Sequence, residues 1–121
     1  MTMLLVIAGG AVGALARYYT EREAVRRFGE RVPWGTALVN VVGAAVLGVV
    51  VGLEQRDVLS HEVLLLLGTG FCGALTTFSG FVGQIESRVR HRASRGVAVR
   101  YGMASLAAGL VAAWLAYSLA A

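Results

Sequence analysis

The chain has 121 residues, of which 57% are hydrophobic and 15% charged, and it carries a formal net charge of +4 at pH 7. Its mean hydropathy of +0.70 is too high for an ordinary soluble domain, and its length leaves room for one domain only. The composition therefore excludes a soluble globular protein. It predicts an all-α integral membrane protein with a single domain over residues 1–121.

Four apolar segments are each long enough to cross a membrane, since a span needs about 20 mostly apolar residues. In chain order they cover about residues 2–19, 34–53, 63–85 and 97–121. The connections between them are short, so consecutive helices must be antiparallel neighbours, and no extramembrane domain remains to carry an enzyme. We predict a four-helix membrane bundle whose function lies within the spans.

The basic residues are distributed unevenly. All eleven are arginine; Arg56 lies alone in the second loop, and the other ten surround the first and third loops: Arg17, Arg22, Arg26, Arg27, Arg31, Arg88, Arg90, Arg92, Arg95 and Arg100. Because loops one and three share a side of a four-span bundle, the positive-inside rule predicts that they are cytoplasmic and that both termini lie outside the plasma membrane. Nucleic-acid binding is not indicated, because no aromatic platform interleaves these arginines. A topology signal with anionic-lipid contact explains them better.

Carboxylates are absent from the middle of the predicted spans. All seven acidic residues lie in loops or at span ends, which argues against a proton-coupled carrier. No Ser, His, Asp constellation is present, so we expect no enzyme. Cys72 is the single cysteine, and His61 and His91 lie in loops without partners at ligand spacing, so no internal disulfide or metal-ligand cluster is expected. A passive route is more consistent with this pattern.

Neutral polar residues do occur within the spans, and they are Thr36, Asn40, Thr69, Thr76, Thr77, Ser79, Tyr101, Ser105 and Ser118. Two interpretations remain open for Asn40: a donor to a ligand, or a hydrogen bond between two helices worth about 1 kcal/mol. Gly9 with Gly13, and Gly48 with Gly52, form G-x-x-x-G pairs, which most often indicate close helix packing.

The stretch GALTTFSGF, Gly73 to Phe81, places glycines and hydroxyls inside the uncharged third span. It predicts a third helix broken near the middle of the membrane, which is tolerated only where the break is buried or lines a polar cavity. Freed carbonyls suit a hard cation such as Na⁺, whereas hydroxyls, N–H groups and aromatic ring edges suit an anion. Phe78 and Phe81 share a helical face; plain lipid or core packing is the alternative explanation for that pair.

Three segments resemble, in order, span signatures of the Fluc/CrcB family of fluoride channels. They are GGAVGALARY at Gly9 to Tyr18, PWGTALVNVVG at Pro33 to Gly43, and GTGFCGALTTFSGF at Gly68 to Phe81. The resemblance covers nearly the whole chain. It implies an antiparallel dimer of four-helix subunits with two fluoride pores along the interface and a structural, non-transported Na⁺ at the centre. The implied function is passive fluoride efflux that lowers cytoplasmic fluoride.

The resemblance also implies roles for single residues by motif position. The backbone carbonyls of Gly73 and Thr76 would bind the Na⁺, and Arg17 would lie near the aqueous vestibule, where a positive charge concentrates anions. The fluoride pore would be lined by side chains from the second, third and fourth spans: Asn40, Thr77, Phe78, Ser79, Phe81, Tyr101 and Ser105.

Four positions depart from the family pattern. Gly80 stands where a threonine is common, Val82 and Gly109 replace serines, and Gln84 replaces a glutamate. These losses and the arginine bias suggest an alternative to a homodimer, namely a subunit that inserts in one orientation and pairs with an oppositely oriented paralogue, leaving one pore degenerate. Two less favoured alternatives are a non-transporting membrane subunit and a small multidrug-type exporter. The exporter would need a glutamate in the first span, and residues 8–16 contain none.

Overall fold

The computed structural model describes residues 1–90 and 95–121, so His91 and Arg92 of the third loop lie outside the described residues. Regular structure in the described part is helical, in the order α1 (Thr2–Phe28), α2 (Trp34–Gln55), α3 (His61–Val63), η1 (Leu64–Cys72), α4 (Gly73–Leu75), α5 (Phe78–Val89) and α6 (Arg95–Ala120). Four described stretches are long and apolar enough to cross a membrane: Thr2–Phe28, Trp34–Gln55, His61–Ser87 and Arg95–Ala120. The predicted all-α fold with four spans is confirmed.

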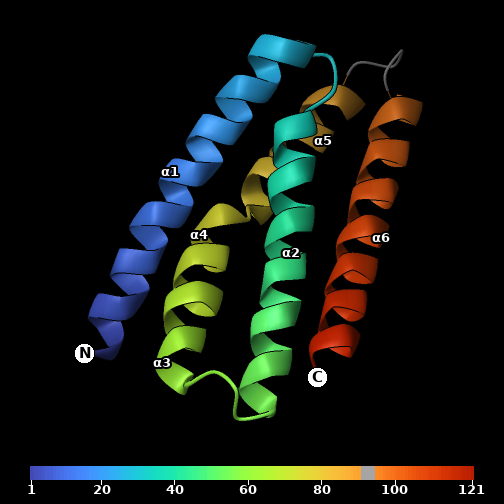
Figure 1. The fold of residues 1–121 in the computed structure, drawn as a ribbon. Coiled ribbons are helices and arrows are strands. Elements are labelled where there is room, and N and C mark those ends of the chain that lie inside the picture. The colour runs from blue at the N-terminus through green and yellow to red at the C-terminus, as the bar shows by residue number, and fades with distance from the viewer. Residues whose placement is uncertain (91–94) are drawn as a thin grey trace.

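The four spans run alongside one another in alternating directions (Figure 1). Both termini lie at the same end of the bundle as the loop that joins α2 to α3. The end of α1, the end of α5 and the starts of α2 and α6 lie at the opposite end, which we call the arginine-rich end. The first and third loops therefore share one end of the bundle, as predicted; which side of the membrane that end faces stays a prediction.

Helix α1 continues to Phe28, beyond the predicted span end at residue 19. Its last turns carry Glu23, whose carboxylate pairs with Arg26 at 2.7 Å and Arg27 at 2.6 Å. Exposed pairs of this kind contribute only about 0–1 kcal/mol each. The helix ends at Gly29, which has a φ of +75° that favours glycine and whose N–H donates to the Val25 carbonyl at 2.8 Å.

Glycines allow two pairs of helices to pack backbone against backbone. Helix α1 packs on η1, where a Cβ at Gly9 or Gly13 would collide with the backbone of Phe71. Helix α2 packs on α6, its most extensive partner, and a Cβ at Gly48 or Gly52 would collide with that helix. Both G-x-x-x-G pairs therefore serve close helix packing, as predicted.

The third span is not one continuous α-helix. After the short helix α3 it continues as the π-helical segment η1, a geometry in which N–H groups reach back five residues. Helix α4 ends at Leu75, Thr76 is extended with φ −79° and ψ 154°, and α5 begins at Phe78. This interruption agrees with the break predicted at TTFSGF. Figure 1 shows the two halves diverging: η1 and α4 pack mainly on α1, whereas α5 packs mainly on α6.

Candidate functional site

A side-chain amide from α2 holds the backbone at the interruption. The Thr77 N–H donates to Asn40 Oδ1 at 2.9 Å, and Asn40 Nδ2 donates to the Thr77 carbonyl at 3.3 Å. These two bonds, which we call the Asn40 clamp, pair both backbone polar groups of a non-helical residue. Of the two interpretations of Asn40, the structure supports a helix-joining role. It leaves the ligand role open, because the amide carries two hydrogens and the clamp uses one.

The threonine hydroxyls at the interruption also satisfy backbone groups. Thr77 Oγ1 accepts the Gly80 N–H at 3.1 Å, which is the N-cap arrangement for the first turn of α5. Thr76 Oγ1 and the Thr76 N–H both donate to the Cys72 carbonyl, at 2.9 and 3.0 Å, at the end of η1. Ser79 Oγ lies 3.4 Å from Thr77 Oγ1. The polar TTFS string thus pairs most of the groups that breaking the helix would release.

The two carbonyls assigned to Na⁺ lie in different surroundings. Arg17 Nη1 donates to the Thr76 carbonyl at 3.4 Å, so the arginine reaches the interruption itself. The N–H that would complete the α-helical bond of the Gly73 carbonyl belongs to Thr77, and it donates to Asn40 instead. A Cβ at Gly73 would meet nothing within 4 Å, so this glycine faces open space. Carbonyl oxygens fit a hard cation, although two are fewer than such an ion usually takes.

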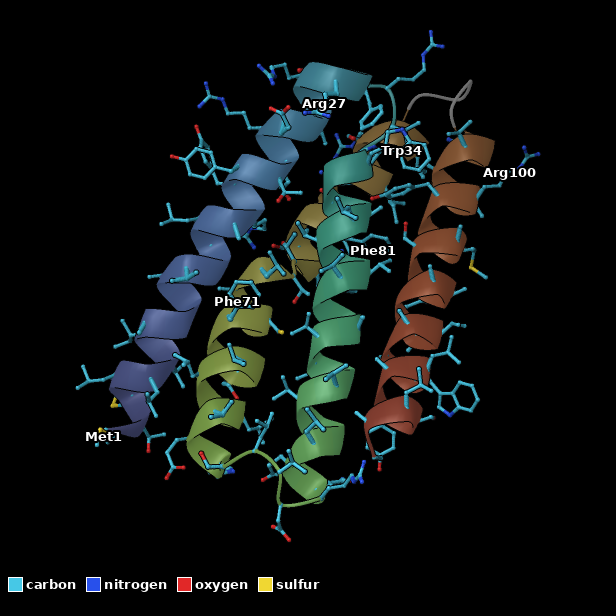
Figure 2. The ribbon with its side chains drawn as sticks, viewed as in Figure 1. Met1, Arg27, Trp34, Phe71, Phe81 and Arg100 are labelled. Atoms are coloured by element: carbon cyan, nitrogen blue, oxygen red, sulfur yellow. The ribbon has the colours of Figure 1, made fainter. Side chains whose placement is uncertain are left out.

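A groove of about 300 Å³ opens beside the interruption, between α2, α5 and α6. We call it the phenylalanine groove. The Phe78 side chain is 78% exposed, its ring centroid lies 6.3 Å from that of Phe81, and the Phe81 centroid lies 6.1 Å from that of Tyr101. Figure 2 shows Phe81 on the α6 side of α2. The groove brings together these predicted residues: Asn40, Thr76, Thr77, Phe78, Phe81 and Ser105.

Tyr101 does not line the phenylalanine groove. Its side chain is buried, and its hydroxyl donates to the Pro33 carbonyl at 3.2 Å, at the start of α2. The Tyr101 ring lies against the Phe81 ring, so Tyr101 supports Phe81 in the groove wall, but its hydroxyl does not face the groove. Ser105, one turn further along α6, does line the groove.

Three side chains that the sequence analysis did not connect form a polar chain at the arginine-rich end. Gln84 Nε2 donates to Thr36 Oγ1 at 2.9 Å, and Thr36 Oγ1 donates to Glu21 Oε1 at 3.3 Å. Thr36 is only 2% exposed, and the three residues line a separate cavity of about 310 Å³. Gln84 therefore points away from the phenylalanine groove, whereas Gly109 lines that groove and leaves its wall without a side chain. In the sequence, only the polar Thr36 within an apolar span could have indicated this polar chain.

Four spans, one of them interrupted beside a partly polar groove, define a small multi-span membrane protein whose chemistry lies inside the bundle. The family described as CrcB-like protein, Camphor Resistance (CrcB), matches residues 4–117. The chain belongs to this CrcB family, as the sequence motifs predicted.

Curated relatives carry a more specific name. Fluoride-specific ion channel FluC 2 of Rhodococcus jostii (strain RHA1) is 46% identical over 121 residues, which cover 98% of each chain. Fluoride-specific ion channel FluC 1 of Streptomyces avermitilis is 45% identical over 123 residues, again with 98% of each chain covered. Fluoride-specific ion channel FluC of Mesorhizobium japonicum is 36% identical over 121 residues and 97% of each chain. These relatives are channels by name, a class distinct from enzymes.

Proposed function

We propose that the chain is a subunit of a fluoride-selective ion channel that lets F⁻ leave the cell passively and so lowers cytoplasmic fluoride. The observation that carries this proposal is the phenylalanine groove, in which the exposed Phe78 and the adjacent Phe81 lie beside the Asn40 amide and the Ser105 hydroxyl. The names of the relatives point to the same ion.

The groove offers what a small anion needs when it loses water. A selective pore must replace the hydration shell with a fixed set of donors. Aromatic rings carry partial positive charge at their edges, and amide and hydroxyl groups donate hydrogen bonds. Arg17 at the interruption adds a positive charge that raises the local anion concentration. The described residues that line the groove carry no carboxylate, which suits passive conduction of an anion.

A second subunit in antiparallel orientation would complete the site. The Gly73 carbonyl, beside open space, and the Thr76 carbonyl, which accepts from Arg17, would supply two oxygens, and two more from the second subunit would bring a bound Na⁺ closer to its usual ligand number. The Na⁺, when bound, would supply positive charge near the pore and join the two interrupted spans. The Asn40 clamp keeps Thr77 bonded to α2 and so steadies the backbone beside those carbonyls.

Fluoride efflux from liposomes tests the proposal. We expect rapid efflux at a fluoride electrode, with no matching chloride efflux and with loss of activity in Na⁺-free samples. Phe81→Ile keeps an apolar side chain but removes the ring edge, so we expect efflux to fall about tenfold or more, the effect of roughly 1.4 kcal/mol on a barrier. Phe71→Ile, the same change on the same span outside the groove lining, should leave efflux unchanged. Equal efflux from both variants would count against the pore assignment.

A one-orientation subunit of a heterodimeric channel is the second candidate. It is favoured by the arginines around the first and third loops, ten of the eleven in the sequence, and by Gly80 and Gly109, which supply no hydroxyl where the family commonly has one. Reporters fused to the C-terminus should then locate it on one side of the membrane only, and liposomes with this chain alone should stay silent until the paralogue is added. Equal amounts of the reporter on both sides of the membrane would contradict this candidate and favour a homodimer.

The remaining alternatives have less support. A non-transporting subunit would tolerate Phe81→Ile without any effect on efflux from the assembled channel. The exporter reading has no supporting observation, since the chain belongs to the CrcB family and residues 8–16 contain no carboxylate.

A further inference from the structure

A second groove, of about 510 Å³, lies between α2 and α6 and shares only Ser105 with the phenylalanine groove. We call it the α2–α6 groove. Apart from the shared Ser105 and from Tyr101, its lining residues are not those assigned to the fluoride pore. Its principal lining residues are Trp34, Ala37 and Val41 from α2, with Arg100, Ala104 and Ala108 from α6.

The groove has a polar end and an apolar floor. Trp34 is 54% exposed and Arg100 is exposed, and Figure 2 shows both at the arginine-rich end of the bundle. Ala104 and Ala108 follow Arg100 at one-turn intervals, and their small side chains leave the space that forms the groove. Eight residues of α-helix rise about 12 Å, so the floor runs from Arg100 well toward the middle of the bundle. This depth matches the upper part of an acyl chain better than a compact ligand.

The charge at the polar end points to an anion. Arg100 belongs to none of the ion pairs found between described residues, and no described carboxylate lies within 4 Å of its guanidinium. The neighbouring Tyr101 also lines the groove, and its hydroxyl donates to the Pro33 carbonyl. Trp and Arg side chains at the end of a span lie at headgroup level, where arginine attracts anionic lipids.

We propose that the α2–α6 groove binds one anionic phospholipid from the leaflet at the arginine-rich end. One acyl chain lies along Ala37, Ala104 and Ala108, and the headgroup phosphate lies on Arg100 beside the Trp34 indole. A phosphate complements the arginine, and a flexible, linear acyl chain fills a narrow apolar groove without requiring a matching protein surface.

Native mass spectrometry of the full chain tests this site, with phosphatidylglycerol and phosphatidylcholine of identical acyl chains as probes. We expect one phosphatidylglycerol to be retained in preference to phosphatidylcholine. Arg100→Gln should lower phosphatidylglycerol retention about fivefold, the effect of one basic residue near a membrane surface, and leave phosphatidylcholine unchanged. Ala104→Leu, which fills the floor, should lower retention of both lipids. Arg22→Gln, which removes an exposed arginine outside the groove, is the matched control and should change neither.

Three outcomes would overturn the proposal. Equal retention of the two lipids by the unmodified chain would remove the headgroup preference. Equal losses from Arg100→Gln and Arg22→Gln would indicate a general charge effect. A fall in the dimer fraction of Ala104→Leu with lipid retention intact would show that a second copy of the chain occupies the groove. Because retention is measured without fluoride, failure here leaves the channel proposal standing, and failure of the channel proposal leaves this site intact.

Discussion

Replacing Gly9 with alanine is expected to lower the free energy of unfolding by about 3 kcal/mol, at the upper end of overpacking costs. The new Cβ would collide with the Leu66 carbonyl and lie 2.9 Å from the Phe71 nitrogen. Both neighbours are backbone atoms of η1, so neither can turn aside as a flexible side chain does. Unfolding of the purified protein in mixed detergent micelles would measure the loss.

Gly10→Ala is the matched control, one residue along the same helix. Its Cβ would meet the Gly70 carbonyl at 3.8 Å and the Ala74 Cβ at 3.9 Å, which are ordinary contacts. Alanine is also favoured over glycine in a helix by about 1 kcal/mol, so we expect this variant to be as stable as the unmodified chain or more so. Similar losses from both variants would mean that α1 does not pack on η1 through Gly9.

Asn40→Leu is expected to cost about 2–6 kcal/mol of stability, because it leaves two backbone groups unpaired at about 1–3 kcal/mol each. Leucine has a similar size, so the change removes the Asn40 clamp without opening a cavity. The Thr77 N–H and carbonyl would lose their partners at the interruption, and the backbone beside the groove would shift. Fluoride efflux should be lost together with stability.

Thr69→Val, in η1 of the third span, provides the comparison for a polar-to-apolar change away from the Asn40 clamp. Thr69 is exposed, so its replacement should leave both unfolding and efflux close to those of the unmodified chain. An Asn40→Leu protein that unfolds normally but does not conduct would assign Asn40 to the ion alone. An Asn40→Leu protein that unfolds and conducts like the unmodified chain would contradict both the clamp role and the ion-binding role of Asn40.

The interruption of the third span could be predicted from the sequence because residues close to one another in the chain produce it. The Thr76 hydroxyl donates to the Cys72 carbonyl, and the Thr77 hydroxyl accepts the Gly80 N–H. Threonine side chains commonly form such short-range bonds to the backbone. The role of Asn40 was different, because its partner lies 37 residues away. Only the packing of α2 on the third span determines that pairing, so the sequence left two interpretations open.

Side-chain direction was the other limit on prediction. Motif position placed Tyr101 in the pore, but the rotation of α6 sends its hydroxyl to Pro33. Gln84 was considered a lost pore contact, yet it joins Thr36 and Glu21 in a chain that a single sequence does not reveal. The π-helical geometry of η1 also escaped prediction, since its apolar and glycine-rich residues suit an ordinary α-helix equally well.

The two halves of the third span pack on different helices, and this difference defines two blocks within the molecule. One block consists of α1 with η1 and α4, which pack through glycine contacts, and the other consists of α2, α5 and α6; α2 also contacts α1 and η1 across the boundary. The covalent link between the two blocks in the third span passes through Thr76 and Thr77, which lie outside the helices on either side. Relative motion of the two blocks would concentrate at this joint. Since Arg17 of one block and Asn40 of the other bond to adjacent residues there, such motion would strain both bonds at once.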